Sequence, residues 1–264
     1  SQDGSVESLS NKYNNTKVIA SKENLGFGAG NNRAYDEATG DFIFLLNPDT
    51  ILIDDSVDRM VQYLRDNEDV GLVSPTLLYE DRTLQRSIRK FYTYFGSLLD
   101  NRFMNPVISK FPSITKILPG LVNHSLSQEI DWAKGAALLL RREVIEEIGL
   151  FDEIFWIYGE EMDLCYRIGE AGWKKVFLNN CTIIHLEGKS TTQASARMFL
   201  MNYKAMYLFL GKHFSNRTLR NYHARVGIIS RIIAMISFRN EKRSSLYKSL
   251  IEWHKTEASN LINN

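Results

Sequence analysis

The sequence predicts an α/β protein built on a mostly parallel sheet, followed by a helical, basic C-terminal extension. Up to residue 191, short apolar runs that suit buried strands alternate with segments of helical periodicity, which is typical of a parallel sheet covered by helices on both faces. From residue 192 the apolar spacing is helical. We therefore expect one domain over residues 1–191 and a helical region over residues 192–264.

The first part of the chain predicts strands and helices in alternation. Three apolar runs with polar flanks are the predicted strands: TKVIAS (16–21), DFIFLLN (41–47) and VGLVSPTLLY (70–79). Gly26 to Gly30 predicts a tight turn that leads into a helix over NNRAYDEAT. Asp54 and Asp55 mark the start of another helix. Its expected apolar face is Val57, Met60, Val61 and Leu64.

Residues 81–130 break this alternation. The stretch is basic and aromatic at its start and then irregular, with three prolines, so we predict an excursion from the sheet. The alternation then resumes with a strand over 135–142, a short helix that Gly149 ends, a helix from about Gly159 to Ala171, and a strand pair over 173–185.

Bulk properties exclude several classes of protein. The net charge is only +1, so we expect no nucleic acid partner. No run of about 18 uncharged apolar residues exists, so nothing is predicted to span a membrane. Cys165 and Cys181 lie in apolar contexts without zinc-ligand spacing, which favours reduced core thiols in a cytoplasmic protein. Positive charge is nevertheless concentrated near the C-terminus, because residues 216–255 contain nine Lys and Arg but only two Glu.

The glycine-rich stretch NLGFGAGNN and the motif LLNPDT are the first two candidate binding elements. The glycines suit a nucleotide loop, but a dinucleotide fingerprint needs a third glycine at the position of Asn31, so a plain tight turn stays open. In LLNPDT a buried strand stops at Pro48 and leaves Asp49 beyond its carboxyl end. Ligands bind at that edge of α/β sheets, and a carboxylate there suits a divalent cation bound to phosphates. A β-turn aspartate is the alternative.

The segment YGEEMDLC places three carboxylates at the start of a predicted helix. Helical spacing puts Glu161 on the same face as the apolar Leu164, Cys165 and Ile168. Glu160 and Asp163 fall toward the other side, where we expect a solvated helix start with Asp163 paired to Arg167 at i,i+4. A charge on the core face needs a partner or a function, so Glu161 is the candidate catalytic residue.

Five motifs occur in order: NLGFGAGNN, LLNPDT, WAKGAALLLRREV, GLFDEIFWIYGEEMDLCYRIGEAGW and IIHLEGKS. Over residues 1–192 they resemble the family 2 glycosyltransferases, in particular the rhamnosyltransferase-like branch. The resemblance implies a Rossmann-like GT-A fold, a nucleotide-sugar donor, Mg²⁺ or Mn²⁺, and inversion at the anomeric carbon.

The resemblance also implies roles for particular residues. The family's aspartate–any–aspartate motif falls on Asn47 to Asp49, so Asp49 becomes the ligand of the metal or the diphosphate. The family's catalytic base falls on Glu161, where Glu replaces the usual Asp, and Asp163 is the second catalytic candidate. His185 matches a histidine that completes the metal site in some relatives, and a strand-end histidine without a ligand is the alternative.

Further residues are expected to line the substrate site. Trp132, Lys134 and Gly135 precede a strand on the acceptor side, and core packing stays open for Trp132. Arg86 and Arg89 either clamp the diphosphate or form a solvated basic loop. The full set expected to contact the donor is Asp3, Asn24, Gly26, Gly28, Asn32, Asn47, Asp49, Trp132, Lys134 and Gly135. Asp3 belongs to SQDGSVE, which resembles the tail of the family's base-binding motif without its preceding strand, so we expect that first strand to be missing.

The resemblance further implies transfer of a sugar from dTDP-L-rhamnose to a lipid-linked saccharide in bacterial surface polysaccharide synthesis. The stretch VGIISRIIAMISF (226–238) carries arginines on an apolar segment. We therefore expect a peripheral protein at the inner face of the cell membrane, with a helix packed on its own core or on a second copy as the alternative. Two other functions stay open, a sugar-nucleotide pyrophosphorylase and a non-catalytic transferase-like scaffold.

Overall fold

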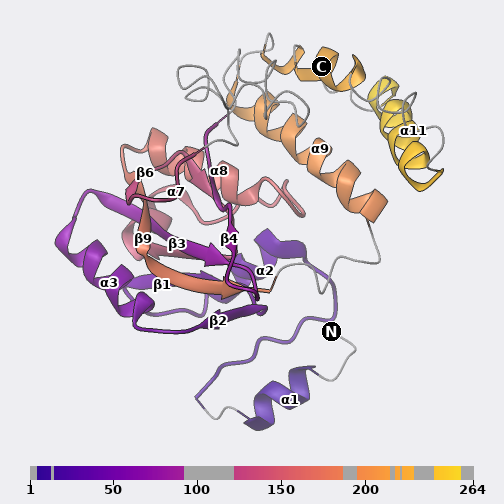
Figure 1. The fold of residues 1–264 in the computed structure, drawn as a ribbon. Coiled ribbons are helices and arrows are strands. Elements are labelled where there is room, and N and C mark those ends of the chain that lie inside the picture. The colour runs from indigo at the N-terminus through magenta and orange to yellow at the C-terminus, as the bar shows by residue number, and fades with distance from the viewer. Residues whose placement is uncertain are drawn as a thin grey trace.

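The computed structural model describes residues 5–12, 15–91, 122–186, 195–214, 218–220, 222–228 and 241–256 (Figure 1). The described strands are β1 Phe42–Leu46, β2 Thr50–Leu52, β3 Val70–Leu78, β4 Leu84–Gln85, β5 Ile88–Arg89, β6 Gln128–Glu129, β7 Trp132–Ala133, β8 Ala137–Arg141 and β9 Lys174–His185. The described helices are α1 Ser5–Lys12, α2 Gly26–Tyr35, α3 Ser56–Asp66, α7 Arg142–Ile148, α8 Glu160–Glu170, α9 Ser195–His213 and α11 Glu241–Lys255.

A seven-stranded sheet forms the centre, in the order β1-β8-β3-β9-β2, with β4 on β3 and β6 on β9. β3 and β9 pair in parallel, whereas β8 pairs antiparallel with both β1 and β3. The strands β1, β3 and β9 therefore share one direction, and β8 runs against them. The α/β class is confirmed. The expectation of parallel strands holds for β1, β3 and β9, which run in the same direction. The pairings of β2 and β6 with β9 and of β4 with β3 are antiparallel.

Helices cover both faces of the sheet because side chains alternate along each strand. Leu138 and Leu140 of β8 pack in the cluster that contains Leu164 and Ile168 of α8. Leu139, between them, packs in the cluster that contains Met60 and Leu64 of α3. The predicted helices α3 and α8 are thus present, and they pack on opposite sides of β8.

The C-terminal helices form a second core together with residues in and before α8. α9 and α11 lie together beyond α8 (Figure 1), and their cluster joins Tyr207, Phe209, Leu250 and Trp253 to Met162 of α8. No helix within the described ranges is long and apolar enough to cross a membrane. Most of the stretch 226–238, on which the membrane prediction rests, lies outside the described residues.

Two predictions near the N-terminus are wrong. Residues 16–20 form no strand, and no described strand lies beside β1 on the side away from β8 to supply backbone partners. Gly26 to Gly30 is not a turn but the start of α2. Its glycines allow close approach of another segment, which is described with the site below. α1 has no counterpart among the predicted elements.

The predicted strand pair over 173–185 is one strand, β9, with an irregularity in its middle. Pairing with β3 jumps from Pro75–Leu178 to Thr76–Thr182. Asn179 does not turn the chain, because its backbone N–H and its amide group bind Ser127 and Ser125. The two asparagines that resemble a turn in the sequence therefore sit in a β-bulge.

The prediction that residues 81–130 leave the sheet is wrong for the two ends of this stretch. β4 pairs with β3, β5 with β7, and β6 with β9, so these flanks belong to the sheets. His124 contributes to this attachment, since its Nε2 accepts hydrogen bonds from the N–H groups of Ser87 and Ile88. Residues 92–121 lie outside the described part of the chain.

We expect Gly26→Ala to destabilise the protein by about 1–3 kcal/mol. Gly26 has φ +81°, and an added Cβ would lie 2.4 Å from the carbonyl oxygen of Trp156. Gly30→Ala in the same helix is the matched control, since an added Cβ there meets nothing within 4 Å, and it should stabilise by about 0.5–1 kcal/mol. Urea unfolding measures both. Equal midpoints for the two variants would contradict this account of Gly26.

Candidate active site

The predicted site residues gather where β1 and β9 end and β8 begins. Asp49 follows β1, His185 is the last residue of β9, and Lys134 and Gly135 precede β8. The backbone N–H of Asn47 donates to the carbonyl of Ala136 at 2.9 Å, which joins the LLNPDT motif to the start of β8. Because β8 runs against β1, the amino end of β8 lies at the carboxyl end of β1. This is the edge where α/β sheets bind ligands.

Asp49 and His185 face each other at this edge. Asp49 Oδ1 lies 3.3 Å from His185 Nε2, and the Leu186 N–H donates to the Asp49 carbonyl at 2.9 Å. β2 pairs with β9 so that Thr50 lies opposite His185. The other ring nitrogen of His185, Nδ1, lies 2.7 Å from the buried side-chain oxygen of Gln85. Both ring nitrogens of His185 therefore have a partner, and its role as a metal ligand stays a prediction.

This donor set fits a divalent cation. If His185 Nδ1–H donates to Gln85 Oε1, the lone pair of Nε2 is directed at Asp49, and these two facing acceptors suit a shared cation. Across the part of the chain that the structure describes, no cluster of three or more His, Cys, Asp or Glu side chains could hold a metal ion. Mg²⁺ and Mn²⁺ sites of this kind rely on substrate phosphates for further ligands.

Glu161 lies in the first turn of α8 and faces the start of β8. A Cβ added at Gly135 would lie 3.6 Å from the Glu161 Cβ and 3.4 Å from the Phe27 ring. Gly135 therefore lies between the Phe27 ring and the base of the Glu161 side chain. Three predicted elements, α2, the 132–135 segment and α8, meet around Glu161.

The two neighbouring carboxyl groups of α8 have perturbed pKa values. Burial, and then the charge of Glu161, raises the pKa of Glu160 from 4.5 to about 8. Burial also raises the pKa of Glu161, against the opposing effects of backbone N–H groups, Lys134 and Arg89. Glu160 is only 4% exposed, and its Oε2 has no hydrogen-bond partner among the described residues. A raised carboxyl pKa suits a group that must accept a proton near neutral pH.

The backbone before α8 is held in unusual conformations. Tyr158 has φ +67° and Gly159 has φ +87°, and left-handed conformations cost energy for a residue with a bulky side chain. Phe155 and Ala205 pack so closely that an added Cβ at Gly159 would lie 3.1 and 3.2 Å from their side-chain atoms. Strain of this kind is common next to functional groups, and it fixes the position of the first turn of α8.

The glycine-rich motif packs against the segment that leads to α8. The Phe27 N–H donates to the Trp156 carbonyl at 3.2 Å, and Gly28 lies against Phe151. Asn32 binds both backbone groups of Phe151, at 2.9 and 3.0 Å. The Asn24 side chain accepts from the Gly26 N–H at 3.1 Å. These contacts hold the glycine-rich segment against the chain that leads into α8. Contact with a donor stays a prediction for Asn24, Gly26, Gly28 and Asn32.

Trp132 and Arg89 lie side by side on β7 and β5. They are opposite each other in the strand register, with the guanidinium 5.8 Å from the ring centre. The Trp132 Nε1–H donates to the Lys90 carbonyl at 3.2 Å, and the ring packs against both core clusters beside α8. Trp132 therefore has a packing role in the described structure. Arg86 is exposed, whereas Arg89 is half-buried and close enough to Glu161 to lower its pKa.

Asp163 is placed differently from the prediction. Its i,i+4 bond to Arg167 is confirmed at 2.7 Å, but the side chain is fully buried and not solvated. Lys212 and His213 of α9 also bind it, at 2.7 and 2.6 Å. Burial alone would raise the pKa of Asp163, but hydrogen bonds from Lys212, His213 and Arg167 outweigh it and hold the pKa below its ordinary value. Glu160 is likewise buried, so the expectation of a solvated helix start is wrong for both.

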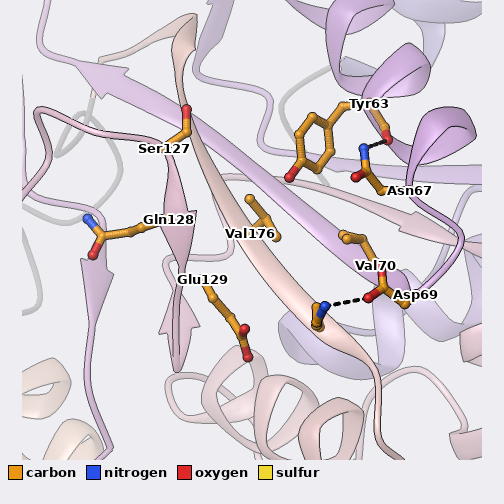
Figure 2. Close-up of a pocket in the computed structure, with 9 residues that line it drawn as sticks. Tyr63, Asn67, Asp69, Val70, Ser127, Gln128, Glu129 and Val176 are labelled. Atoms are coloured by element: carbon orange, nitrogen blue, oxygen red, sulfur yellow. Dashed lines mark hydrogen bonds and ion pairs between the residues drawn. The ribbon is translucent and has the colours of Figure 1, made fainter.

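A cavity of about 230 Å³ lies at the opposite end of the sheet (Figure 2). It is bounded by the first residues of β3 and β9, whereas His185 is the last residue of β9. Lys174 at its edge is paired with Asp69. None of the predicted site residues lines it.

Sequence reasoning missed four contributors to the site. Gln85 lies in a basic segment without a recognisable motif. Lys212 and His213 are far from α8 in the sequence, so no local pattern links them to Asp163. Glu160 could have been found as the neighbour of an inward carboxylate, since two adjacent charges at a buried helix start cannot both be solvated. Asp3 lies outside the described residues.

Comparisons with known proteins show what this chain is similar to. The model of the family described as glycosyl transferase family 2 matches residues 1–149. An N-acetylglucosaminyl-diphospho-decaprenol L-rhamnosyltransferase of Mycobacterium tuberculosis is 24% identical over 93% of this chain and 84% of its own length. The rhamnosyltransferase WbbL of Escherichia coli K12 is 26% identical over 73% of both chains. The solved structure of the mannosyltransferase PcManGT of Pyrobaculum calidifontis, in complex with GDP-Man and Mn²⁺, is 14% identical, with a TM-score of 0.49 over 95% of this chain and 73% of that chain.

Proposed function

Since the chain belongs to glycosyl transferase family 2, we propose that it is an inverting glycosyltransferase that uses Glu161 as its base. The reaction transfers a sugar from a nucleoside diphosphate to a hydroxyl group of a saccharide acceptor. The observation that carries this proposal is that the Asp49–His185 pair and the half-buried Glu161 both lie at the edge of the sheet where β8 begins, since Asn47 binds Ala136 and Glu161 packs beside Gly135.

The proposed reaction is a single displacement. The Glu161 carboxylate removes the proton of an acceptor hydroxyl, and the oxygen attacks the anomeric carbon while the bond to the diphosphate breaks. The diphosphate leaves with the bonding electrons from the opposite face of the sugar. Burial raises the pKa of Glu161, and the charges of Lys134 and Arg89 oppose this rise and favour the ionised form that accepts a proton.

Asp49 and His185 are the residues that would hold Mg²⁺ or Mn²⁺. When bound, such a cation stabilises the negative charge on a leaving diphosphate. Gln85 fixes the orientation of the His185 ring through the bond to Nδ1. Glu160, with its raised pKa, stays largely neutral at pH 7 and so spares Glu161 an adjacent negative charge.

The rhamnosyltransferase relatives suggest the substrates. We propose dTDP-L-rhamnose as donor and a lipid-linked saccharide as acceptor, because one relative is named for rhamnosyl transfer to N-acetylglucosaminyl-diphospho-decaprenol. The pathway proposed is the synthesis of a surface polysaccharide. A panel of nucleotide sugars, scored for released nucleoside diphosphate, tests the function and separates it from a pyrophosphorylase or a scaffold.

A lipid-linked acceptor would place the protein at the inner face of the membrane. We propose that the basic C-terminal region holds it there, with contact to a second copy as the alternative use of the same surface. The excess of nine Lys and Arg over two Glu between residues 216 and 255 supports this, since each basic residue near an anionic surface contributes about 1 kcal/mol. Full-length protein should sediment with anionic vesicles at low salt and dissociate at high salt. Equal sedimentation after removal of residues 216–264 would rule out this anchor.

A further inference from the structure

The end of α9 is attached directly to the helix that carries Glu161. Asp163, two residues after Glu161, is bound through Oδ1 by Lys212 Nζ and His213 Nε2, and through Oδ2 by Arg167 Nε. The Asp163 N–H donates to the Gly159 carbonyl at 2.8 Å and so closes the first turn of α8. The attachment therefore acts on the same helical turn that presents Glu161.

Lys212 also reaches the segment on the other side of Glu161. Its Nζ lies 2.6 Å from Asp152 Oδ2 and 5.8 Å from the centre of the Phe155 ring. Phe155 in turn packs against Gly159, the residue that precedes α8. A single lysine thus binds the chain both before and after the Glu160–Glu161 pair.

Neutralising Asp163 does not require α9. Arg167, on the same helix, already supplies a positive charge at i,i+4 and also binds the carbonyls of Ile148, Gly149 and Leu150. Lys212 and His213 of α9 instead join α8 to an element that is far away in sequence. A bond between two elements fixes the position of the first turn of α8 relative to α9, whereas the pair of Asp163 with Arg167 within α8 does not.

We propose that Lys212 and His213 are positioning residues that hold the first turn of α8, and with it Glu161, in place for proton removal. This inference rests on the proposed function of Glu161. It assigns the helical C-terminal region a part in the reaction as well as in any membrane contact. A displacement of about 1 Å in a reacting group can cost up to about 10²-fold in rate.

The test replaces Lys212 by Met, which keeps the length of the side chain and its helix propensity. Arg167 and His213 still pair with Asp163, so the variant should fold. We expect kcat to fall about tenfold with the donor KM changed less than about twofold, and Lys212→Arg to restore most of the rate. Lys204→Met, the same change two turns earlier on α9, is the matched control, because the Lys204 ammonium lies 5.7 Å from the centre of the Trp253 ring of α11. Its kcat should match that of the parent protein.

Hydrogen–deuterium exchange of the peptide that covers residues 156–170 gives a readout independent of turnover. The amides of the first turn of α8 should exchange faster in Lys212→Met than in Lys204→Met. Unchanged kcat together with unchanged exchange would overturn the inference while the proposed function stands. Failure of the parent protein to release nucleoside diphosphate would refute the proposed function, and the exchange comparison would then still decide whether Lys212 holds α8.

Discussion

Replacement of Glu161 by Gln is expected to reduce kcat by about 10²–10⁴-fold, the usual contribution of a general base. Glutamine has the size of glutamate and cannot accept the acceptor proton. Donor affinity should stay within a few-fold, since the proposed donor ligands, Asp49 and His185, are untouched. Glu170→Gln, an exposed change in the last turn of the same helix, should leave kcat unaltered. Near-normal turnover of Glu161→Gln would show that this residue is not the base.

The pH profile gives a second test of the same residue. Because the base must be ionised and burial raises the pKa of Glu161, activity should fall as the pH drops through a value above the ordinary 4.5. Lys134 lowers this pKa, so Lys134→Met should move the acid limb of kcat/KM to higher pH. The same change at Lys174, paired with Asp69 at the far end of β9, should not move it. An acid limb at the ordinary carboxyl pKa would contradict the assignment.

Removal of divalent metal is expected to stop turnover, and Asp49→Ala should weaken donor binding by at least about tenfold when manganese is present. The reason is that Asp49 and His185 provide the only protein ligands proposed for the cation that binds the diphosphate. Isothermal titration with the donor and Mn²⁺ measures the loss. Asp58→Ala, an exposed acid on α3, is the control. Full activity in chelator would show that Asp49 and His185 serve another purpose.

Much of the fold could be predicted because its signals are local. The strand over 41–47, the helix that starts after Asp55 and the helix that Gly149 ends each depend on apolar spacing and terminal residues within the segment itself. The strand over 16–21 failed because a strand also needs a neighbour, which the sequence of the segment does not reveal. The bulge at Asn179 was not predicted for a related reason. Its hydrogen-bond partners Ser125 and Ser127 lie just before β6, about fifty residues away in the sequence.

The site was predictable to the extent that it lies at strand ends. Asp49 and His185 were both placed at the carboxyl edge of the sheet, and the structure brings them together. The family assignment is confirmed by the match over residues 1–149. The burial of Asp163 could not be predicted, because its partners Lys212 and His213 come from a helix about fifty residues away. A carboxylate that looks solvated within its own helix can be buried when another element supplies its hydrogen-bond partners.

The central claim is that Glu161 and the Asp49–His185 pair carry out one inverting displacement on a nucleotide sugar. The most direct measurement incubates the protein with a nucleotide-sugar panel, manganese and a lipid-linked saccharide, and follows both products. Chromatography gives the released nucleotide, and NMR gives the anomeric configuration of the transferred sugar. The account predicts one nucleoside diphosphate per transferred sugar and a configuration opposite to that of the donor. Release of pyrophosphate, or transfer with the donor configuration retained, would contradict it.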